Sequence, residues 1–319
     1  MRDAPDEPQM TQGPQMTPAS APSEPAAASP AWARGSHAAL WRARIGMMRP
    51  GNCLMSAAGV LTGLAVALPA GGVHLATWIG APAAAFLLAA FGNILNDLRD
   101  ERIDARAHPE RALPSGRIGR RQAIWTAGFF LGFGLWEAWA AAGWPTLAFA
   151  GVNALGLVLY ETAFKRLGLP GNVLIALLVA STFAFGALAA GAAPGEWGLL
   201  WLLIAMAFLA NVARELLKDI EDMPADSGQR ETLPLRAGAG VARLLAFFLV
   251  NAAVLLSVLA FIRPPAGWSG LWLAVLAGAD LLFVVGSSLA WMDVAQAQRT
   301  LKLAMLVALA AFLAGPLLP

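Results

Sequence analysis

Residues 96–104 read Asn-Asp-Leu-Arg-Asp-Glu-Arg-Ile-Asp and come directly after an apolar run that covers residues 78–95. Asp97, Asp100 and Asp104 follow the spacing i, i+3, i+7, which places their side chains on one face of a helix. Like charges stacked in this way repel by roughly a few tenths of a kcal/mol per pair. Near lipid an ionised group must also be paired or ligated. The stretch therefore predicts a helix end that needs a cation.

The same spacing of acids occurs a second time in the chain, at Asp219, Asp222 and Asp226, again just after an apolar run. A single cluster of this kind is usually no more than a solvated helix end. Two copies, each ending a predicted membrane span on the same face, favour one site built from two halves. We therefore expect two Asp-rich helix ends that face each other.

The composition excludes a soluble globular domain. Of the 319 residues, 58% are hydrophobic and 13% are charged, whereas a soluble domain carries about 25% charged residues. A single cysteine, Cys53, excludes an internal disulfide and a cysteine-based metal cluster. The chain is therefore predicted to be an integral membrane protein, and nothing in it predicts a nucleic-acid partner.

The apolar runs have the length of helices that span a ~30 Å hydrocarbon core, and the fold predicted from them is an all-α bundle of nine transmembrane helices with cytoplasmic cap loops. Residues 37–319 form this membrane domain, and residues 1–36, rich in Pro, Ala and Ser, are predicted to be a disordered tail. The predicted spans cover residues 53–71, 75–98, 121–142, 145–163, 171–191, 197–217, 241–262, 268–290 and 299–317.

Basic residues are strongly biased to one side of this predicted topology. The N-terminal segment and the even-numbered gaps between spans hold nearly all of them, whereas the odd-numbered gaps hold only Arg263. By the positive-inside rule the N-terminus and both acidic clusters face the cytoplasm and the C-terminus lies outside. The expected location is the cytoplasmic (inner) membrane, with multiple spans.

Carboxylates clustered without His or Cys are typical ligands of hard cations. Mg²⁺ prefers oxygen ligands and often shares its shell with substrate phosphates, while Arg and Lys bind the same anion from the other side. We therefore predict an Mg²⁺–diphosphate site at the membrane face, where loss of diphosphate from an allylic carbon starts the reaction. Its predicted metal ligands are Asn96, Asp100, Asp104, Asp219, Asp222 and Asp226, with Asp97 beside them, and its predicted cations are Arg111, Lys165, Arg214 and Lys218.

Three other polar residues fall inside or at the ends of spans. Tyr160, five residues before Lys165, is either an interfacial residue or a phenol that contacts the diphosphate or the acceptor. Glu137 and Asp280 lie on the wrong side of the membrane or too deep for the diphosphate site. We expect these two carboxylates to serve helix packing or the membrane interface.

These motifs resemble those of the UbiA superfamily of intramembrane prenyltransferases over about residues 40–319. The two acidic clusters resemble its two aspartate-rich motifs, and residues 160–165 resemble its Tyr-to-Lys motif. Residues 111–116 (Arg-Ala-Leu-Pro-Ser-Gly) resemble the basic element after the first motif, and residues 49–52 (Arg-Pro-Gly-Asn) resemble the entry to the first helix. The resemblance implies nine helices and Mg²⁺-dependent transfer of an isoprenyl group from its diphosphate to an acceptor, with Asn52 near the site.

Residues 211–222 look like the branch that contains geranylgeranylglyceryl phosphate geranylgeranyltransferase, although Met-Pro-Ala-Asp at residues 223–226 departs from it. That branch implies a geranylgeranyl donor and a glycerol phosphate lipid as acceptor. An aromatic quinone precursor or a chlorophyllide-type alcohol is the alternative acceptor. A cation transporter is the alternative outside enzymes, but it predicts acids spread along several spans near mid-membrane.

Overall fold

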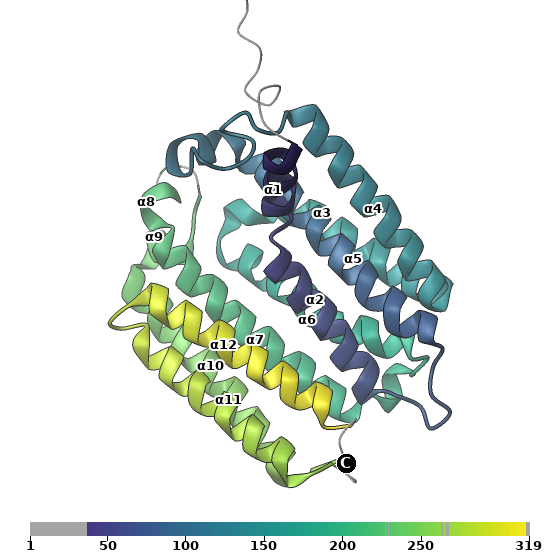
Figure 1. The fold of residues 1–319 in the computed structure, drawn as a ribbon. Helices are drawn as coiled ribbons and strands as arrows, with labels where there is room; N and C mark the ends of the chain where they lie inside the picture. Colours follow the sequence, from purple (N-terminus) through teal and green to yellow (C-terminus); the bar gives the residue numbers. More distant parts are fainter. Residues whose placement is uncertain (1–36, 227, 229, 263, 266–267, 317–319) are drawn as a thin grey trace, which may run out of the picture.

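A computed structural model of the chain describes residues 37–226, 228, 230–262, 264–265 and 268–316. Over these residues all regular secondary structure is helical, and no strand occurs (Figure 1). The predicted all-α class is therefore confirmed. The tail predicted over residues 1–36 lies outside the described residues.

Each predicted span corresponds to one long helix of the described chain. Six of these helices, α3, α6, α7, α10, α11 and α12, are long and apolar enough to cross a membrane, so the protein is a multi-pass membrane protein. α2 is apolar but has 17 residues, and nine spans remains a prediction. The long helices are α2 (Pro50–Val66), α3 (Leu75–Ala107), α4 (Arg120–Ala142), α5 (Trp144–Thr162), α6 (Leu169–Ala189), α7 (Gly198–Glu221), α10 (Ala239–Ile262), α11 (Gly270–Leu289) and α12 (Val294–Ala314).

The boundaries at the first two spans differ from the predicted ones. α2 begins at Pro50, because a proline at the first helical position loses no hydrogen bond and already has a helical φ. α3 continues nine residues past the predicted end at residue 98. Its 33 residues are about 50 Å long at 1.5 Å per residue, so the whole acidic stretch lies on a helix that extends beyond a ~30 Å hydrocarbon core.

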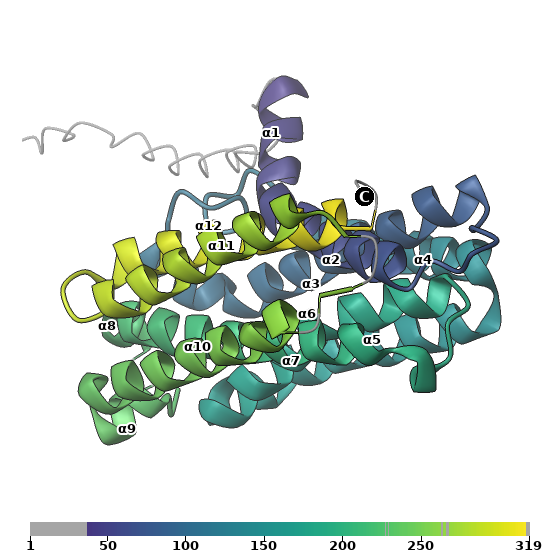
Figure 2. The same cartoon turned by 90° about the horizontal axis from the view of Figure 1, so that it is seen from below.

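The long helices pack side by side, and most of the short elements gather at one end of the bundle. α2 packs against α3 and α6, α6 against α7, and α7 against α10 and α12. α8 (Met223–Asp226), α9 (Leu233–Ala237) and the α3–α4 connection lie at the same end (Figure 1), where α1 (His37–Met48) projects from the bundle (Figure 2). The C-terminal end of α3, with its acids, points to this end.

Glycines allow α2 and α6 to approach each other at backbone distance. A Cβ added at Gly63 of α2 would overlap the Phe183 carbonyl oxygen, and one at Gly186 of α6 would overlap the Val60 carbonyl oxygen. Small residues at helix contacts are a common means of close packing in membranes. This contact fixes α2, which carries Asn52, against the centre of the bundle.

We expect Gly63→Ala and Gly186→Ala each to lower the free energy of unfolding by about 1–3 kcal/mol, because the added methyl forces two backbones apart. The measurement is thermal unfolding of the purified protein in detergent. Gly278→Ala in α11 is the matched control, since its Cβ would meet no atom within 4 Å. Equal unfolding temperatures for all three variants would contradict the close α2–α6 contact.

Candidate active site

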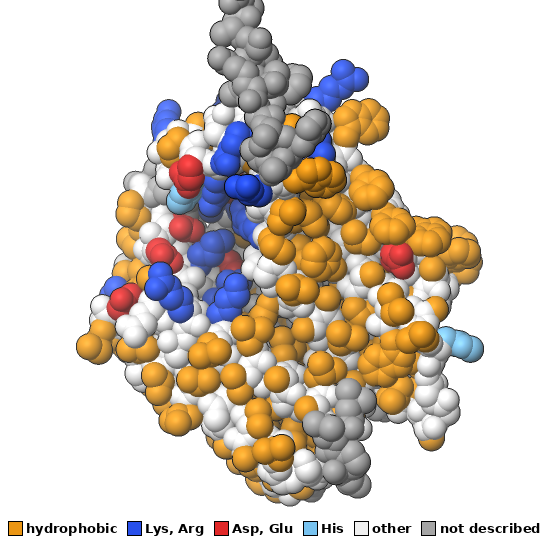
Figure 3. Space-filling view, in the orientation of Figure 1, with side chains coloured by type: hydrophobic (Ala, Val, Ile, Leu, Met, Phe, Trp, Pro, Cys, Tyr) orange, Lys and Arg blue, Asp and Glu red, His pale blue; other side chains and the backbone are white. Residues whose placement is uncertain are grey.

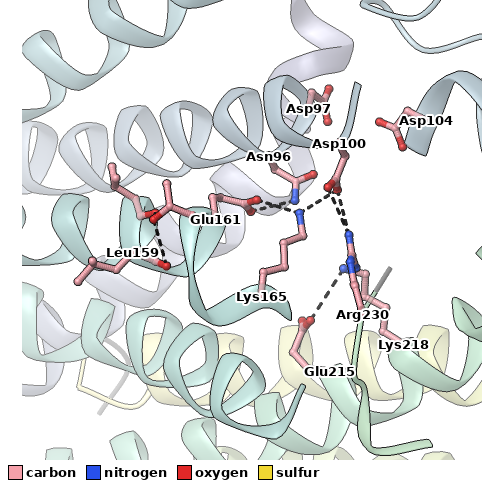
Figure 4. Close-up of polar contacts among 12 residues, drawn as sticks. Asn96, Asp97, Asp100, Asp104, Leu159, Glu161, Lys165, Glu215, Lys218 and Arg230 are labelled. Atoms are coloured by element: carbon pink, nitrogen blue, oxygen red, sulfur yellow. Dashed lines mark hydrogen bonds and ion pairs between the residues drawn. The ribbon is translucent and has the colours of Figure 1, made fainter. Parts of the chain in front are cut away.

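The acids of α3 are held by cations that come from three other segments. Arg49, just before α2, donates from Nη2 to Asp97 Oδ1 at 2.6 Å. Lys165, in the short helix η2 (Phe164–Leu167), donates from Nζ to Asp100 Oδ2 at 2.8 Å. Arg230, in the α8–α9 connection, lies 3.3 Å from both Asp100 carboxylate oxygens (Figure 4). The repulsion expected within the acidic stretch is thus offset by pairing.

Asp104 and Asn96 complete the α3 half of the site. Asp104 is buried and accepts two hydrogen bonds of 2.7 Å from Nη1 of Arg111. Asn96 accepts from Arg49 Nη2 at 3.0 Å and donates to Glu161 Oε1 at 2.9 Å. Its amide therefore bridges a cation and an acid.

Glu161 is a site residue that the sequence interpretation missed. It is buried at the end of α5 and accepts from Lys165 Nζ at 2.8 Å through Oε2. Its signal was present in the sequence, because an acid four residues before a lysine is a favourable helical pair. Arg49 had only a weaker signal, as part of the segment that enters the first helix, and Arg230 was not among the predicted site residues.

The α7 half of the site holds Arg214, Glu215 and Lys218. Buried Glu215 is 2.5 Å from Arg214 Nη2 and 3.9 Å from Lys218 Nζ. One turn further, Asp219 accepts a 2.7 Å hydrogen bond from Asn172 of α6. Asp222 is the C-cap residue that directly follows α7. That the two acidic helix ends together form one site stays a prediction.

Asp226 lies in α8, and its side chain is outside the described part of the structure.

A cavity of about 340 Å³ separates the two halves. Its polar end is lined by both the predicted and the missed residues, namely Arg49, Asn52, Asn96, Tyr160, Glu161, Arg214, Glu215 and Lys218. The rest is lined mainly by apolar side chains of α2, α6, α7, α10, α11 and α12, including Phe183, Phe283 and Phe312. The remaining described residues of the predicted site are not among those that line the cavity: Asp97, Asp100, Asp104, Arg111, Lys165, Asp219 and Asp222.

Asp280 of α11 lines the same cavity and accepts a 2.6 Å hydrogen bond from Ser257 Oγ of α10. This bond joins two helices, as expected for a packing role. The contact of Asp280 with the cavity was not expected from the sequence.

The carboxylates supply oxygen donors only, which suits a hard divalent cation. Among the described residues, no three His, Cys, Asp or Glu side chains are grouped as a ready metal site. Mg²⁺ does not require such a group, because it keeps several waters and binds through one or two carboxylates plus substrate phosphates. The donor chemistry therefore fits Mg²⁺ bound together with a phosphate-bearing substrate.

A charged and an apolar region divide one face of the molecule. In Figure 3, Lys and Arg side chains gather with Asp and Glu near the end that carries the cap loops, and hydrophobic side chains cover most of the remaining surface. This distribution suits a polar site at the edge of a lipid phase.

Comparison with known proteins places the chain among prenyltransferases. A model described as UbiA prenyltransferase family matches residues 56–314. The digeranylgeranylglyceryl phosphate synthase of Methanopyrus kandleri is 38% identical over 282 residues, which are 86% of this chain and 99% of that protein. The enzyme of the same name from Haloquadratum walsbyi is 37% identical over 280 residues, which are 86% of this chain and 94% of that protein.

Solved structures have the same fold. A structure concerned with digeranylgeranylglyceryl phosphate synthase in membranes has a TM-score of 0.67 and 28% identity, and the match covers 87% of this chain and 98% of that one. A UbiA homologue from Archaeoglobus fulgidus, bound to GPP and Mg²⁺, has a TM-score of 0.66 and 16% identity, with coverage of 85% and 98%. At 16% identity, the similarity to the Archaeoglobus fulgidus structure shows a shared fold only.

We expect Lys165→Met to destabilise the protein by about 3–5 kcal/mol, because it leaves buried Glu161 and partly buried Asp100 with one cation fewer. The double variant Glu161→Gln/Lys165→Met should recover part of the loss, since it removes one of the unpaired charges. Chemical or thermal unfolding in detergent measures both. Arg166→Met is the control, because Arg166 is exposed; a Lys165→Met variant as stable as this control would show that the buried pairing contributes nothing.

Proposed function

This chain belongs to the UbiA prenyltransferase family, and from that premise we propose that it transfers a geranylgeranyl group from its diphosphate to geranylgeranylglyceryl phosphate, with Mg²⁺ as cofactor. One observation carries the choice of acceptor. Relatives named digeranylgeranylglyceryl phosphate synthase match at 37–38% identity over 94–99% of their own length. The cavity supports prenyl transfer, since its polar end can take a diphosphate and its apolar part can take the attached hydrocarbon chain.

The diphosphate binds, in this proposal, between the α3 and α7 helix ends. Mg²⁺ bound there supplies Lewis acidity and positions the phosphates. Asp100, Asp104, Asp219 and Asp222 are its proposed ligands, with Asn96, Asp97 and Asp226 completing the two motifs. In the described structure Lys165 pairs with Asp100 and Arg111 with Asp104. If these carboxylates held Mg²⁺, the two cations would be released to bind the diphosphate.

The released cations stabilise the leaving group. Lys165 and Arg111, together with Arg214 and Lys218, donate to the departing diphosphate, which takes the electron pair of the broken carbon–oxygen bond. The acceptor hydroxyl then forms the new carbon–oxygen bond and loses its proton. Tyr160 and Asn52, which line the cavity beside these cations, position the two substrates.

Aromatic faces in the cavity suit the positive charge that develops on the allylic carbon. Tyr160, Phe183 and Phe283 line it, and an aromatic face attracts a nearby cation by up to about 2 kcal/mol when water is excluded. The prenyl chain extends away from the charged end along the apolar walls. The transporter alternative is disfavoured, because the described acids apart from Glu137, Glu196 and Asp280 gather near one end of the bundle.

The proposed site faces the cytoplasm, with the C-terminus outside. The positive-inside distribution supports this orientation.

Cysteine labelling tests it in a Cys53→Ala background, where Gly71→Cys lies in the α2–α3 loop and His108→Cys follows α3. A membrane-impermeant maleimide should label Gly71→Cys in intact cells and His108→Cys only after permeabilisation. The reverse pattern would show the opposite orientation.

Asp100→Asn and Asp222→Asn should each reduce prenyl transfer at least about 100-fold, since a metal ligand is lost. The unfolding temperature should stay near that of the wild type for Asp222→Asn, whereas Asp100→Asn should lower it, because Lys165 and Arg230 lose a charged partner. Chelation by EDTA should abolish transfer, and added Mg²⁺ should restore it. Glu196→Gln, in the exposed loop at the other end of α7, is the control. Full activity in EDTA would refute the metal-dependent mechanism.

Product analysis tests the acceptor. The purified protein is incubated with radiolabelled geranylgeranyl diphosphate and one acceptor at a time: geranylgeranylglyceryl phosphate, an aromatic quinone precursor, or a chlorophyllide-type alcohol. The proposal expects a labelled diether phospholipid product from the first. Transfer only to an aromatic or chlorophyllide-type acceptor would overturn the assignment.

A further inference from the structure

Lys302 is a charged residue within a helix that can span the membrane, and the proposed diphosphate site does not use it. It lies on α12 and lines the central cavity. Among the described residues its ammonium makes no ion pair and no hydrogen bond. A charge inside a span needs an anionic partner or access to water, so Lys302 is suited to bind an anionic ligand in the cavity.

The position of Lys302 brings it level with the cations of α7. α7 and α12 pack together, and Glu221 near the end of α7 contacts Gln298 near the start of α12. From that contact, at 1.5 Å per residue, Lys302 lies about 6 Å deeper. On α7, Lys218 lies about 4.5 Å and Arg214 about 10.5 Å deeper. The three cations therefore form one band on the α7–α12 wall of the cavity, which all three line.

The charge balance of this wall differs from that of the α3 half. In the described α3 half, four carboxylates are matched by four cations: Asp97, Asp100, Asp104 and Glu161 with Arg49, Arg111, Lys165 and Arg230. On the α7–α12 wall, Glu215 alone pairs with Arg214 and Lys218, and Lys302 adds another positive charge. Asp280 also lines the cavity, but its carboxylate accepts from Ser257. Among the residues that line the cavity, this wall therefore has three cations, Arg214, Lys218 and Lys302, against two carboxylates, Glu215 and Asp280. Asp219 of α7 accepts from Asn172 and is outside the lining.

Below Lys302, the same face of α12 becomes apolar. Met305, Leu309 and Phe312 follow at helical spacing, and all three line the cavity with Lys302. An amphiphile with an anionic head and a hydrocarbon chain matches this stripe. Lysine suits the head, because its ammonium is a compact point charge on a flexible stem that reaches toward the polar end.

We propose that Lys302 binds the phosphate monoester of the acceptor lipid on the α7–α12 wall, and so selects a phosphate-bearing acceptor. The diphosphate of the donor stays between the α3 and α7 helix ends, as proposed above, and Lys302 of α12 is left for the second head group. The proposal rests on the proposed function, since it requires a glycerol phosphate lipid as acceptor. It assigns Lys302 a role in specificity, and the leaving group is stabilised by other residues.

The test compares two acceptors in neutral detergent, which removes anionic membrane lipid as a competing ligand. These are geranylgeranylglyceryl phosphate and the phosphate-free geranylgeranylglycerol, each with geranylgeranyl diphosphate. Lys302→Met should raise the KM for the phosphate acceptor about 10–100-fold, the effect of losing one charge-assisted hydrogen bond. The KM for the donor should stay unchanged, and the preference for the phosphate acceptor should fall by the same factor.

Two variants control for charge and structure. Lys302→Arg should keep most of the preference, because it keeps the positive charge. Arg299→Gln removes a charge about one turn earlier on α12, where Arg299 is exposed and outside the cavity lining, and it should change neither KM. Unfolding temperatures confirm that each variant is folded, and Lys302→Gln replaces Lys302→Met if the latter is not.

Several outcomes would overturn the proposal. A higher KM for the donor alone would place Lys302 at the diphosphate, and equal losses with both acceptors would show a packing role. Unchanged kinetics, or a wild type that uses both acceptors equally, would exclude the phosphate contact. A wild-type protein that transfers to neither glycerol lipid but does prenylate an aromatic acceptor would refute the proposed function itself. This outcome needs only the wild-type protein, so it is distinct from a failure of the Lys302 proposal, which needs the variants.

Discussion

The structure depends on the pairing of the α3 carboxylates with cations from distant parts of the chain. Asp97 is held by Arg49, Asp104 by Arg111, and Asp100 by Lys165 and Arg230. A buried carboxylate without a partner is far more costly than a paired one. The segment before α2, the η2 helix and the α8–α9 connection must therefore all meet the end of α3. This requirement closes one end of the bundle and gives the cavity its polar end.

Much of this arrangement follows from spacing in the sequence. The acids at spacing i, i+3, i+7 lie on the last turns of α3. The second cluster begins on the last turn of α7, and Tyr160 lines the cavity between these two helices. The all-α class and a polar site at one end also follow, because long apolar runs leave helices as the only spanning structure for such a chain. The spacing of residues along a helix and the composition of a span depend only on neighbouring residues in the sequence. They can therefore be recognised before the fold is known.

The individual pairings could not be predicted, because they join residues far apart in the sequence. Asp100 and Arg230 are 130 positions apart, and Arg49 and Asp97 are 48 apart. Which of several cations meets which acid depends on how α2, α5 and α7 pack, and that depends on contacts such as Gly63 against Phe183. Glu161 was missed for another reason. Only the first and last residues of the Tyr-to-Lys motif, Tyr160 and Lys165, were assigned to the site, whereas Glu161 between them accepts a hydrogen bond from Asn96.

The two sides of the cavity differ in charge: on one, the carboxylates and cations are equal in number, and on the other, cations outnumber the carboxylates that line the cavity. This difference explains how one small space can take two anionic lipids. A balanced wall binds a diphosphate only if a divalent cation comes with it, since the carboxylates otherwise keep their cations. A wall with surplus positive charge binds a phosphate monoester directly. Two like-charged head groups placed together would repel strongly in a water-poor site. Mg²⁺ between the α3 and α7 helix ends and Lys302 on α12 would hold the two heads at different places, while both chains share the apolar interior that includes Phe183 and Phe312.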